Sequence, residues 1–198
     1  MVTPNWSHTT KLNFMSIVDM LLPSTIISTK SSRHFQFGGQ NLLIWEYLLI
    51  SLDSLPQPLS DPTSQLLDIS AYYTVSPPYF FNGYFSSLSR NNRIKTITAL
   101  EDLQVPLDKL PFPYQNNPTL IKIMINSLYQ ITLFGYYSEW TGYLYTRYYS
   151  PSYRQLLTFP LGWIYSGYPG PSYGYRDFRG FLLKMEKTYV ERDSNEKL

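Results

Sequence analysis

The sequence predicts a mainly α fold, a single helical domain with a long irregular, aromatic and Gly/Pro-rich C-terminal part. Apolar residues recur at helical spacing over residues 10–134, and no period-2 alternation stands out. Residues 136–175 hold eleven of the 19 tyrosines without sustained periodicity. With 198 residues, 43% of them hydrophobic, the chain can bury the core of one domain. We expect one domain over residues 1–198, helical over 10–134, irregular over 135–180 and ending in a charged tail at 184–198.

Three helices are predicted in the first part of the chain. The first runs from Thr10 to Leu22, where the following proline ends it. The second runs from Asn41 to about Leu55 and is apolar almost all round, so we expect it to be the buried one. Asp61 and Pro62 are typical of an N-cap and first turn, and they open a third helix that Pro77 closes. The apolar positions of the first helix are Phe14, Ile17, Val18 and Leu21.

Helical spacing continues through the middle of the chain. One series lies on each side of Ser89, and the proline-rich segment Leu107–Pro118 follows as a connection. Asn117 then caps the clearest helix, Thr119–Phe134, which Gly135 stops. From Phe181 to the end we expect a short helix that frays. The two series are Phe81, Tyr84, Phe85 and Leu88, then Ile94, Ile97, Leu100 and Leu103; the inner face of the clearest helix is Ile121, Met124, Ile125, Leu128 and Ile131.

The bulk composition disfavours several classes of partner. The net charge is +2, which gives no electrostatic reason to expect nucleic acid or an anionic membrane. Charged residues make up only 15% of the chain, so part of the surface is expected to be covered by another molecule. The most apolar run, Leu42–Leu52, is interrupted by Glu46 and is about half the roughly 20 residues that span a bilayer. We therefore expect no transmembrane segment, and we find no export signal near the N-terminus.

Residues that could carry chemistry are few. The chain has no cysteine, and its two histidines, His8 and His34, are too few for a three-histidine zinc site and are expected to be surface or capping residues. Glu101 and Asp102 are adjacent, so on a helix they point about 100° apart and cannot work as a paired acid and base. No dinucleotide or triphosphate motif is present, so no cofactor is expected in this chain. The simplest roles of the other acidic residues considered are a cap for Asp61, a helix surface for Asp68 and a loop salt bridge for Asp177.

The segment Gly162–Gly180, GWIYSGYPGPSYGYRDFRG, is the most distinctive part of the sequence. Its glycines permit backbone angles closed to other residues and its prolines fix φ, which predicts an ordered loop rather than a helix or strand. Tyr, Trp and Arg are enriched at interface hot spots, so the loop either binds a partner or packs on its own domain. Nucleic acid and sugar platforms fit less well, because arginines 147, 154, 176 and 179 only slightly outnumber the local acids and stacking does not explain the Gly-Pro pattern.

This segment resembles the C-terminal signature of the gluconate 2-dehydrogenase subunit 3 family. Three further stretches are similar in the same order along the chain: FMSIVDMLLPS (Phe14–Ser24), FSSLSRNNRIKTITAL (Phe85–Leu100) and FGYYS (Phe134–Ser138). The chain departs from the family by lacking a twin arginine and the usual Gly-Gly-Asn element between Tyr137 and Trp163. The positions that match the signature are Gly162, Trp163, Gly167, Tyr168, Pro169, Gly170, Tyr175, Arg176 and Asp177, and we expect Trp163, Tyr168, Tyr175 and Arg176 to anchor the loop.

The resemblance implies a small, mostly helical subunit without a cofactor of its own. Its partner would be a large FAD-containing subunit of the glucose-methanol-choline (GMC) type that oxidises a sugar, sugar acid or polyol, with a cytochrome as electron acceptor. The small subunit would stabilise the large one and assist its export. Export or attachment to the cell envelope through the partner is the favoured location, and the cytoplasm is the alternative. The alternative functions are a stand-alone module that binds a carbohydrate or a protein, and an enzyme active without added flavoprotein.

Overall fold

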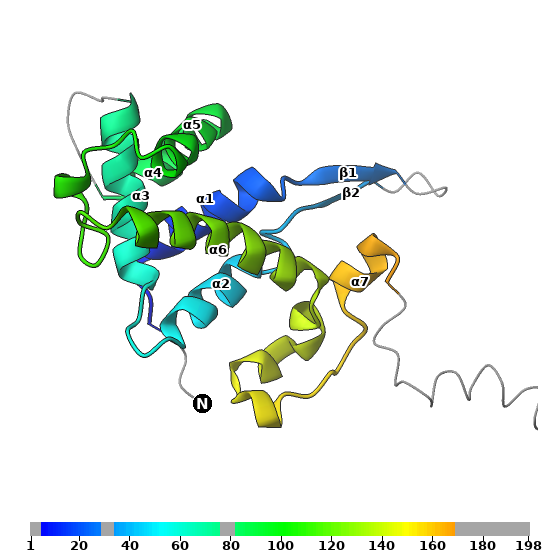
Figure 1. The fold of residues 1–198 in the computed structure, drawn as a ribbon. Coiled ribbons are helices and arrows are strands. Elements are labelled where there is room, and N and C mark those ends of the chain that lie inside the picture. Colours follow the sequence, from blue (N-terminus) through cyan, green and yellow to red (C-terminus); the bar gives the residue numbers. More distant parts are fainter. Residues whose placement is uncertain (1–4, 29–33, 76–81, 169–198) are drawn as a thin grey trace, which may run out of the picture. The chain divides into compact units, whose positions relative to one another are not determined.

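The computed structural model describes residues 5–28, 34–75 and 82–168, and of residues 26–28, 34–37 and 165 it describes the backbone alone. The described part is mainly helical, as predicted (Figure 1). Residues 1–166 form one compact unit and residues 167–198 a second. The helices are α1 (His8–Leu21), α2 (Ile44–Asp53), α3 (Ser60–Val75), α4 (Tyr84–Ser87), α5 (Arg90–Glu101), α6 (Pro118–Tyr137) and α7 (Leu161–Ser166); the 3-10 helices are η1 (Leu107–Lys109), η2 (Trp140–Tyr148) and η3 (Pro151–Tyr153); the strands are β1 (Thr25–Ser28) and β2 (His34–Phe37).

Helix α1 lies at the centre of the helical core. It packs on α2, α3, α4, α5 and α6, while α3 packs on α5 and α2 on α6. The apolar positions predicted for α1 are buried except Leu21, which is partly buried against the core. Helix α2 was expected to be the buried helix, and Ile44, Leu48 and Leu49 on it have no exposed surface. The predicted periodicity therefore found the faces that make the core.

Side chains bind the first backbone amides of several helices. Ser7 caps α1 by accepting from the N–H of Thr10 at 3.0 Å, and Asn117 caps α6 by accepting from Leu120 at 3.1 Å. The cap expected at Asp61 is wrong, because α3 begins one residue earlier at Ser60. The Ser60 N–H instead donates to the carboxylate of Asp53, at the end of α2. The tertiary fold thus supplies an acceptor that the local sequence does not reveal.

Gly135 does not stop the long helix, contrary to the prediction. Helix α6 continues to Tyr137 and contains Gly135 as a buried residue. A Cβ at this position would lie 2.9 Å from Cδ1 of Tyr47 and 3.0 Å from Cγ2 of Ile44, both on α2. The glycine therefore allows α6 and α2 to approach each other closely. Its role is helix packing rather than termination.

A β-hairpin follows α1 and was not predicted. Strands β1 and β2 pair antiparallel with Thr25 opposite Phe37 and Ser28 opposite His34, and the hairpin projects from the helices in Figure 1. Gly38 fixes the hairpin at its base, because a Cβ there would lie 2.6 Å from the backbone nitrogen of Ser24. The N–H of Gly39 donates to the carbonyl of Leu22 at 2.9 Å. Four-residue strands are too short to produce a clear period-2 signal.

Three further expectations need correction. Ile94, a member of the apolar series predicted for its helix, is 41% exposed on α5. Asp68, expected on a helix surface, is buried on α3. Gly162 and Trp163, expected in a loop, lie in the short helix α7.

Some predictions fall on residues that the structure does not describe. These are Phe81, the rest of the loop from residue 169, and the C-terminal tail. Within the described ranges, no helix combines the length and apolarity needed to cross a bilayer.

Candidate partner-docking surface

Residues 133–166 form a C-terminal segment that wraps back onto α2 and α6. It contains the end of α6, the 3-10 helices η2 and η3, an extended stretch and α7 (Figure 1). Two buried tryptophans fix its backbone to the core, and most of its other large apolar side chains face outward. We call these outward side chains the C-terminal apolar surface. Its members are Leu133, Phe134, Tyr137, Leu144, Tyr145, Tyr153, Leu156, Leu157, Phe159, Leu161 and Ile164.

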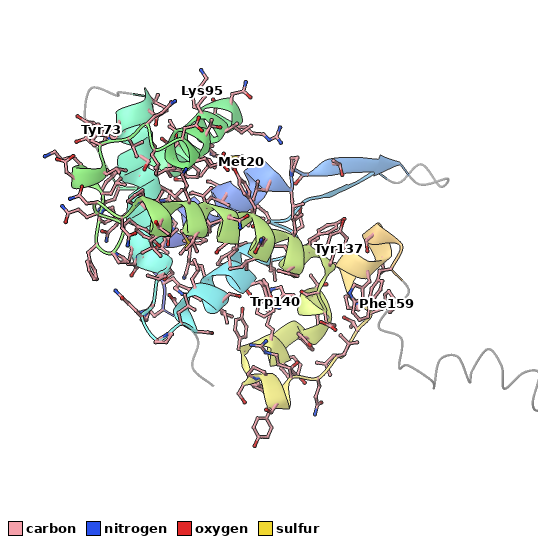
Figure 2. The ribbon with its side chains drawn as sticks, viewed as in Figure 1. Met20, Tyr73, Lys95, Tyr137, Trp140 and Phe159 are labelled. Carbon is pink, nitrogen blue, oxygen red and sulfur yellow. The ribbon has the colours of Figure 1, made fainter. Side chains whose placement is uncertain are left out.

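Trp140 is the first anchor of this segment. Its side chain is 1% exposed, and its indole Nε1–H donates to the carbonyl of Leu43 at 2.9 Å. Leu43 precedes α2 in a left-handed conformation with φ of 56°, so the tryptophan binds a backbone group at the start of that helix. The Trp140 ring also packs edge-on against Tyr47, with 5.4 Å between ring centroids. Figure 2 shows Trp140 where the chain turns after α6.

A buried ion pair reinforces the attachment to α2. Nε of Arg147 lies 2.8 Å from Oε2 of Glu46, with side-chain exposures of 14% and 10%. The hydroxyl of Tyr148 donates to the same carboxylate oxygen at 2.9 Å, and the guanidinium lies 4.8 Å from the Tyr148 ring centroid. Burial, followed by the hydrogen bond to Glu46, raises the pKa of Tyr148. The partners of Glu46, the acidic residue within the apolar run Leu42–Leu52, are therefore Arg147 and Tyr148, about a hundred positions later.

Trp163 is the second anchor, and it holds α7 on the end of α6. Its side chain is 2% exposed, and its Nε1–H donates to the carbonyl of Tyr137 at 2.8 Å. This carbonyl belongs to the last turn of α6, where backbone acceptors lack partners within the helix. Gly162 also lies against α6, because a Cβ at this position would clash with the carbonyl oxygen of Tyr136. The Gly-Trp pair thus packs directly on two successive peptide groups of α6.

Gly142 joins η2 to the extended stretch. Its carbonyl accepts from the N–H groups of Leu157 at 2.9 Å and Thr158 at 3.1 Å. A Cβ on Gly142 would lie 2.5 Å from the Thr158 carbonyl oxygen, so the two backbones touch. The buried hydroxyl of Thr146 also donates to the carbonyl of Gln155 at 2.9 Å. The segment therefore has a fixed backbone although it contains little regular helix.

The segment combines this fixed backbone with an unusual outer face. Among the described residues, eighteen large hydrophobic side chains are exposed, and eleven of them belong to residues 133–166. The most exposed within this segment are Tyr153 at 73%, Phe134 at 66% and Tyr145 at 59%. Scattered exposed apolar residues are normal, but such a concentration on one segment is typical of an interaction surface. Its ordered aromatic side chains suit the recognition of another molecule.

Described residues of the four stretches that carry the family resemblance contact one another in two pairs. In the first pair, the guanidinium of Arg90 donates twice to the carbonyl of Met20 at 2.9 and 3.1 Å. Arg93 of the same stretch forms a 3.4 Å ion pair with Asp19. In the second pair, the Gly162–Trp163 step packs on the Tyr136–Tyr137 step through the contacts described above. Trp163 was expected to anchor this segment, whereas the packing roles of Arg90, Arg93 and Gly162 were not predicted.

The other expected site residues are placed as follows. Gly167 has a left-handed φ of 70°, and a Cβ on it would meet nothing within 4 Å. Tyr168 is 43% exposed. Pro169, Gly170, Tyr175, Arg176 and Asp177 lie outside the described residues. Sequence reasoning missed Trp140, Glu46 and Arg147 as anchors, although a carboxylate in an otherwise apolar helix was a usable signal for a buried partner.

A cavity lies away from this surface, between the start of α1 and α3. Its volume is about 430 Å³, and Thr10, Asp61, Ser64 and Asp68 are among the residues that line it. Asp68 on this wall is 2% exposed, and its two oxygens accept from the amides of Gly83 and Phe85 at 2.7 and 2.9 Å. Burial raises the pKa of Asp68. Its role is therefore to hold the start of α4. Over the described ranges no three His, Asp or Glu side chains gather as metal ligands.

Comparison with known proteins identifies no relative. No family model, no curated protein and no solved structure matches this chain.

Proposed function

We propose that this chain is a non-catalytic accessory subunit of an oxidoreductase complex. Its partner is a large FAD-dependent dehydrogenase of the GMC type that oxidises a sugar, sugar acid or polyol. The partner carries the FAD, and the small chain binds and stabilises it and accompanies it during export. The C-terminal apolar surface is the observation that carries this proposal, because its exposed aromatic side chains suit a protein interface.

The ordered sequence motifs support the choice of partner. Their resemblance to the gluconate 2-dehydrogenase subunit 3 family implies a flavoprotein, whereas the apolar surface by itself suits any protein with a complementary face. The aromatic residues also suit a carbohydrate, so a stand-alone sugar-binding module is the competing outcome of the experiment. A cytochrome that accepts electrons from the flavoprotein would be a further member of the complex.

The test is purification of the tagged full chain from its native cells. We expect a large protein with a flavin absorption spectrum to co-purify in a fixed ratio. The complex should reduce an artificial electron acceptor with a sugar, sugar acid or polyol, and the small chain alone should not. Recovery of the chain without any flavoprotein would refute the proposal, and specific binding to a glycan array would favour the carbohydrate module.

A further inference from the structure

Four exposed side chains lie near the end of α6, on α7 and on the stretch that precedes α7. We call Phe134, Tyr137, Phe159 and Ile164 the α6–α7 patch; their exposures are 66%, 56%, 51% and 55%. Phe134 and Tyr137 are three residues apart on α6, so they are neighbours on its surface. The Phe159 ring packs edge-on at 5.5 Å from that of Trp163, and Ile164 follows Trp163 on α7. Figure 2 shows Tyr137 and Phe159 on either side of α7.

Two of the three charged side chains in the segment that carries this patch are engaged with the protein itself. Residues 133–166 contain only Glu139, Arg147 and Arg154 as charged residues. Arg147 pairs with Glu46, and Arg154 donates to the carbonyl of Tyr149 at 3.1 Å. The Arg154 guanidinium also lies 5.7 Å from the Trp140 ring centroid. The outer face of the segment is thus apolar and hydroxyl-bearing, with little free charge.

This chemistry selects among the possible occupants of the surface. Helices that lie on membranes usually carry Lys and Arg on a polar face, whereas the two arginines of this segment are bound to Glu46 and to the Tyr149 carbonyl. Nucleic acids also require cations that contact phosphates. Protein interface cores are instead depleted of charge and enriched in Tyr, Trp and Phe. An uncharged apolar protein face is the complementary partner.

The support of the patch strengthens this interpretation. Trp163 and Gly162 fix α7 against α6, so the four side chains project from a backbone that is already in place. Binding then requires little ordering of the segment, which favours affinity. A flat lipid surface gains nothing from such fixed placement, whereas a shaped protein face does.

We infer that the α6–α7 patch is the centre of the interface with the flavoprotein, and that the flavoprotein presents an apolar, uncharged face to it. This inference rests on the proposed function. The association is then driven by apolar burial, so it resists salt. Screening removes interactions between exposed charges above about 0.1 M salt but leaves apolar contacts in place.

The experiment measures binding of purified full chain to the flavoprotein that co-purifies with it from native cells. The test variant is the double substitution Phe134→Ala and Ile164→Ala. The control is Phe112→Ala with Ile123→Ala, which removes the same residue types at exposures of 74% and 55% elsewhere on the protein. We expect the test variant to weaken binding by about 100-fold or more and the control by less than about threefold. Wild-type affinity should change little between roughly 0.1 and 1 M salt.

Each other outcome overturns the inference in a recognisable way. Equal losses in the two double variants, or no loss in either, would remove the patch from the interface while leaving the proposed function intact. A steep fall in affinity with salt would contradict the uncharged partner face. If the wild-type chain dimerises with concentration and the test variant does not, the patch binds a second copy. If the wild-type chain binds phosphatidylcholine vesicles and the test variant does not, the patch binds lipid. If wild-type chain binds no flavoprotein, both the inference and the proposed function fail. Unchanged thermal unfolding of both variants verifies that folding is intact.

Discussion

Replacing Gly162 by Ala tests how α7 is held on α6. The new Cβ would clash with the Tyr136 carbonyl oxygen and lie 3.2 Å from its carbonyl carbon. Cβ contacts under 3.0 Å are essentially never observed, and the obstacle is helix backbone rather than a flexible side chain. Helix α7 must therefore move outward, and the short indole contact of Trp163 with Tyr137 must break.

The cost follows from what α7 loses when it moves. Loss of a buried tryptophan from its packing costs about 3–5 kcal/mol. Alanine recovers about 1 kcal/mol, because it favours a helical backbone over glycine. The expected net destabilisation of the docked α7 is therefore about 2–4 kcal/mol. Gly167→Ala is the matched control, since a Cβ there meets nothing within 4 Å and the only cost is the left-handed φ of 70°, roughly 1–2 kcal/mol.

Two measurements detect the loss. Urea unfolding followed by tryptophan fluorescence reports the global free energy of unfolding, and amide hydrogen exchange reports local opening of α7. The N–H of Ile164, which donates to the Pro160 carbonyl at 3.2 Å, is the most direct local probe. We expect faster exchange there in Gly162→Ala than in Gly167→Ala. Equal exchange and equal unfolding midpoints in the two variants would refute the close packing of Gly162 on α6.

Three further predictions concern buried polar groups. Glu46→Gln leaves the Arg147 guanidinium without its buried counter-ion and should lower the free energy of unfolding by about 3 kcal/mol. The control is Asp108→Asn, which breaks the exposed ion pair with Lys109 and should leave the urea unfolding midpoint unchanged. Burial raises the pKa of Tyr114 to about 12 from 10.0, so the protein should lose stability as pH rises from 10 to 12, and unfolding of Tyr114→Phe across that range should show a shallower loss. Burial also raises the pKa of Asp68 above 3.8. The stability that protonated Asp68 contributes is fully present below pH 3.8 and is lost as pH rises through the raised pKa. Asp68→Asn should therefore flatten this part of the plot of unfolding free energy against pH. An unchanged slope would contradict the raised pKa.

Local signals were sufficient to predict most of the helices. Asn117 with Pro118 at the start of α6, and the apolar spacing of Phe14 and Ile17 in α1, depend on neighbours within one or two turns. Such signals are visible in a single sequence because the physical interactions that they reflect are local. The helical fold class followed from them.

Features that depend on distant residues could not be predicted in the same way. Gly135 was expected to end a helix, yet its packing role depends on Tyr47, which lies 88 positions earlier in the chain. Asp68 was placed on a surface because nothing nearby shows that the amides of Gly83 and Phe85 lie against it. The candidate site was predicted only in part. Trp163 was singled out from its motif, whereas Trp140 acts through a carbonyl 97 residues away.

The long separation between Glu46 and its partner has a consequence for how the chain folds in the cell. The two residues are 101 positions apart, and the ribosome adds about 5–20 residues per second. Helix α2 therefore leaves the ribosome on the order of 5–20 s before Arg147 can pair with the Glu46 carboxylate. During that interval the helix carries an unpaired carboxylate in the middle of its apolar surface, which disfavours premature burial. We therefore expect the packing of α2 to be completed only after the aromatic C-terminal segment has been synthesised.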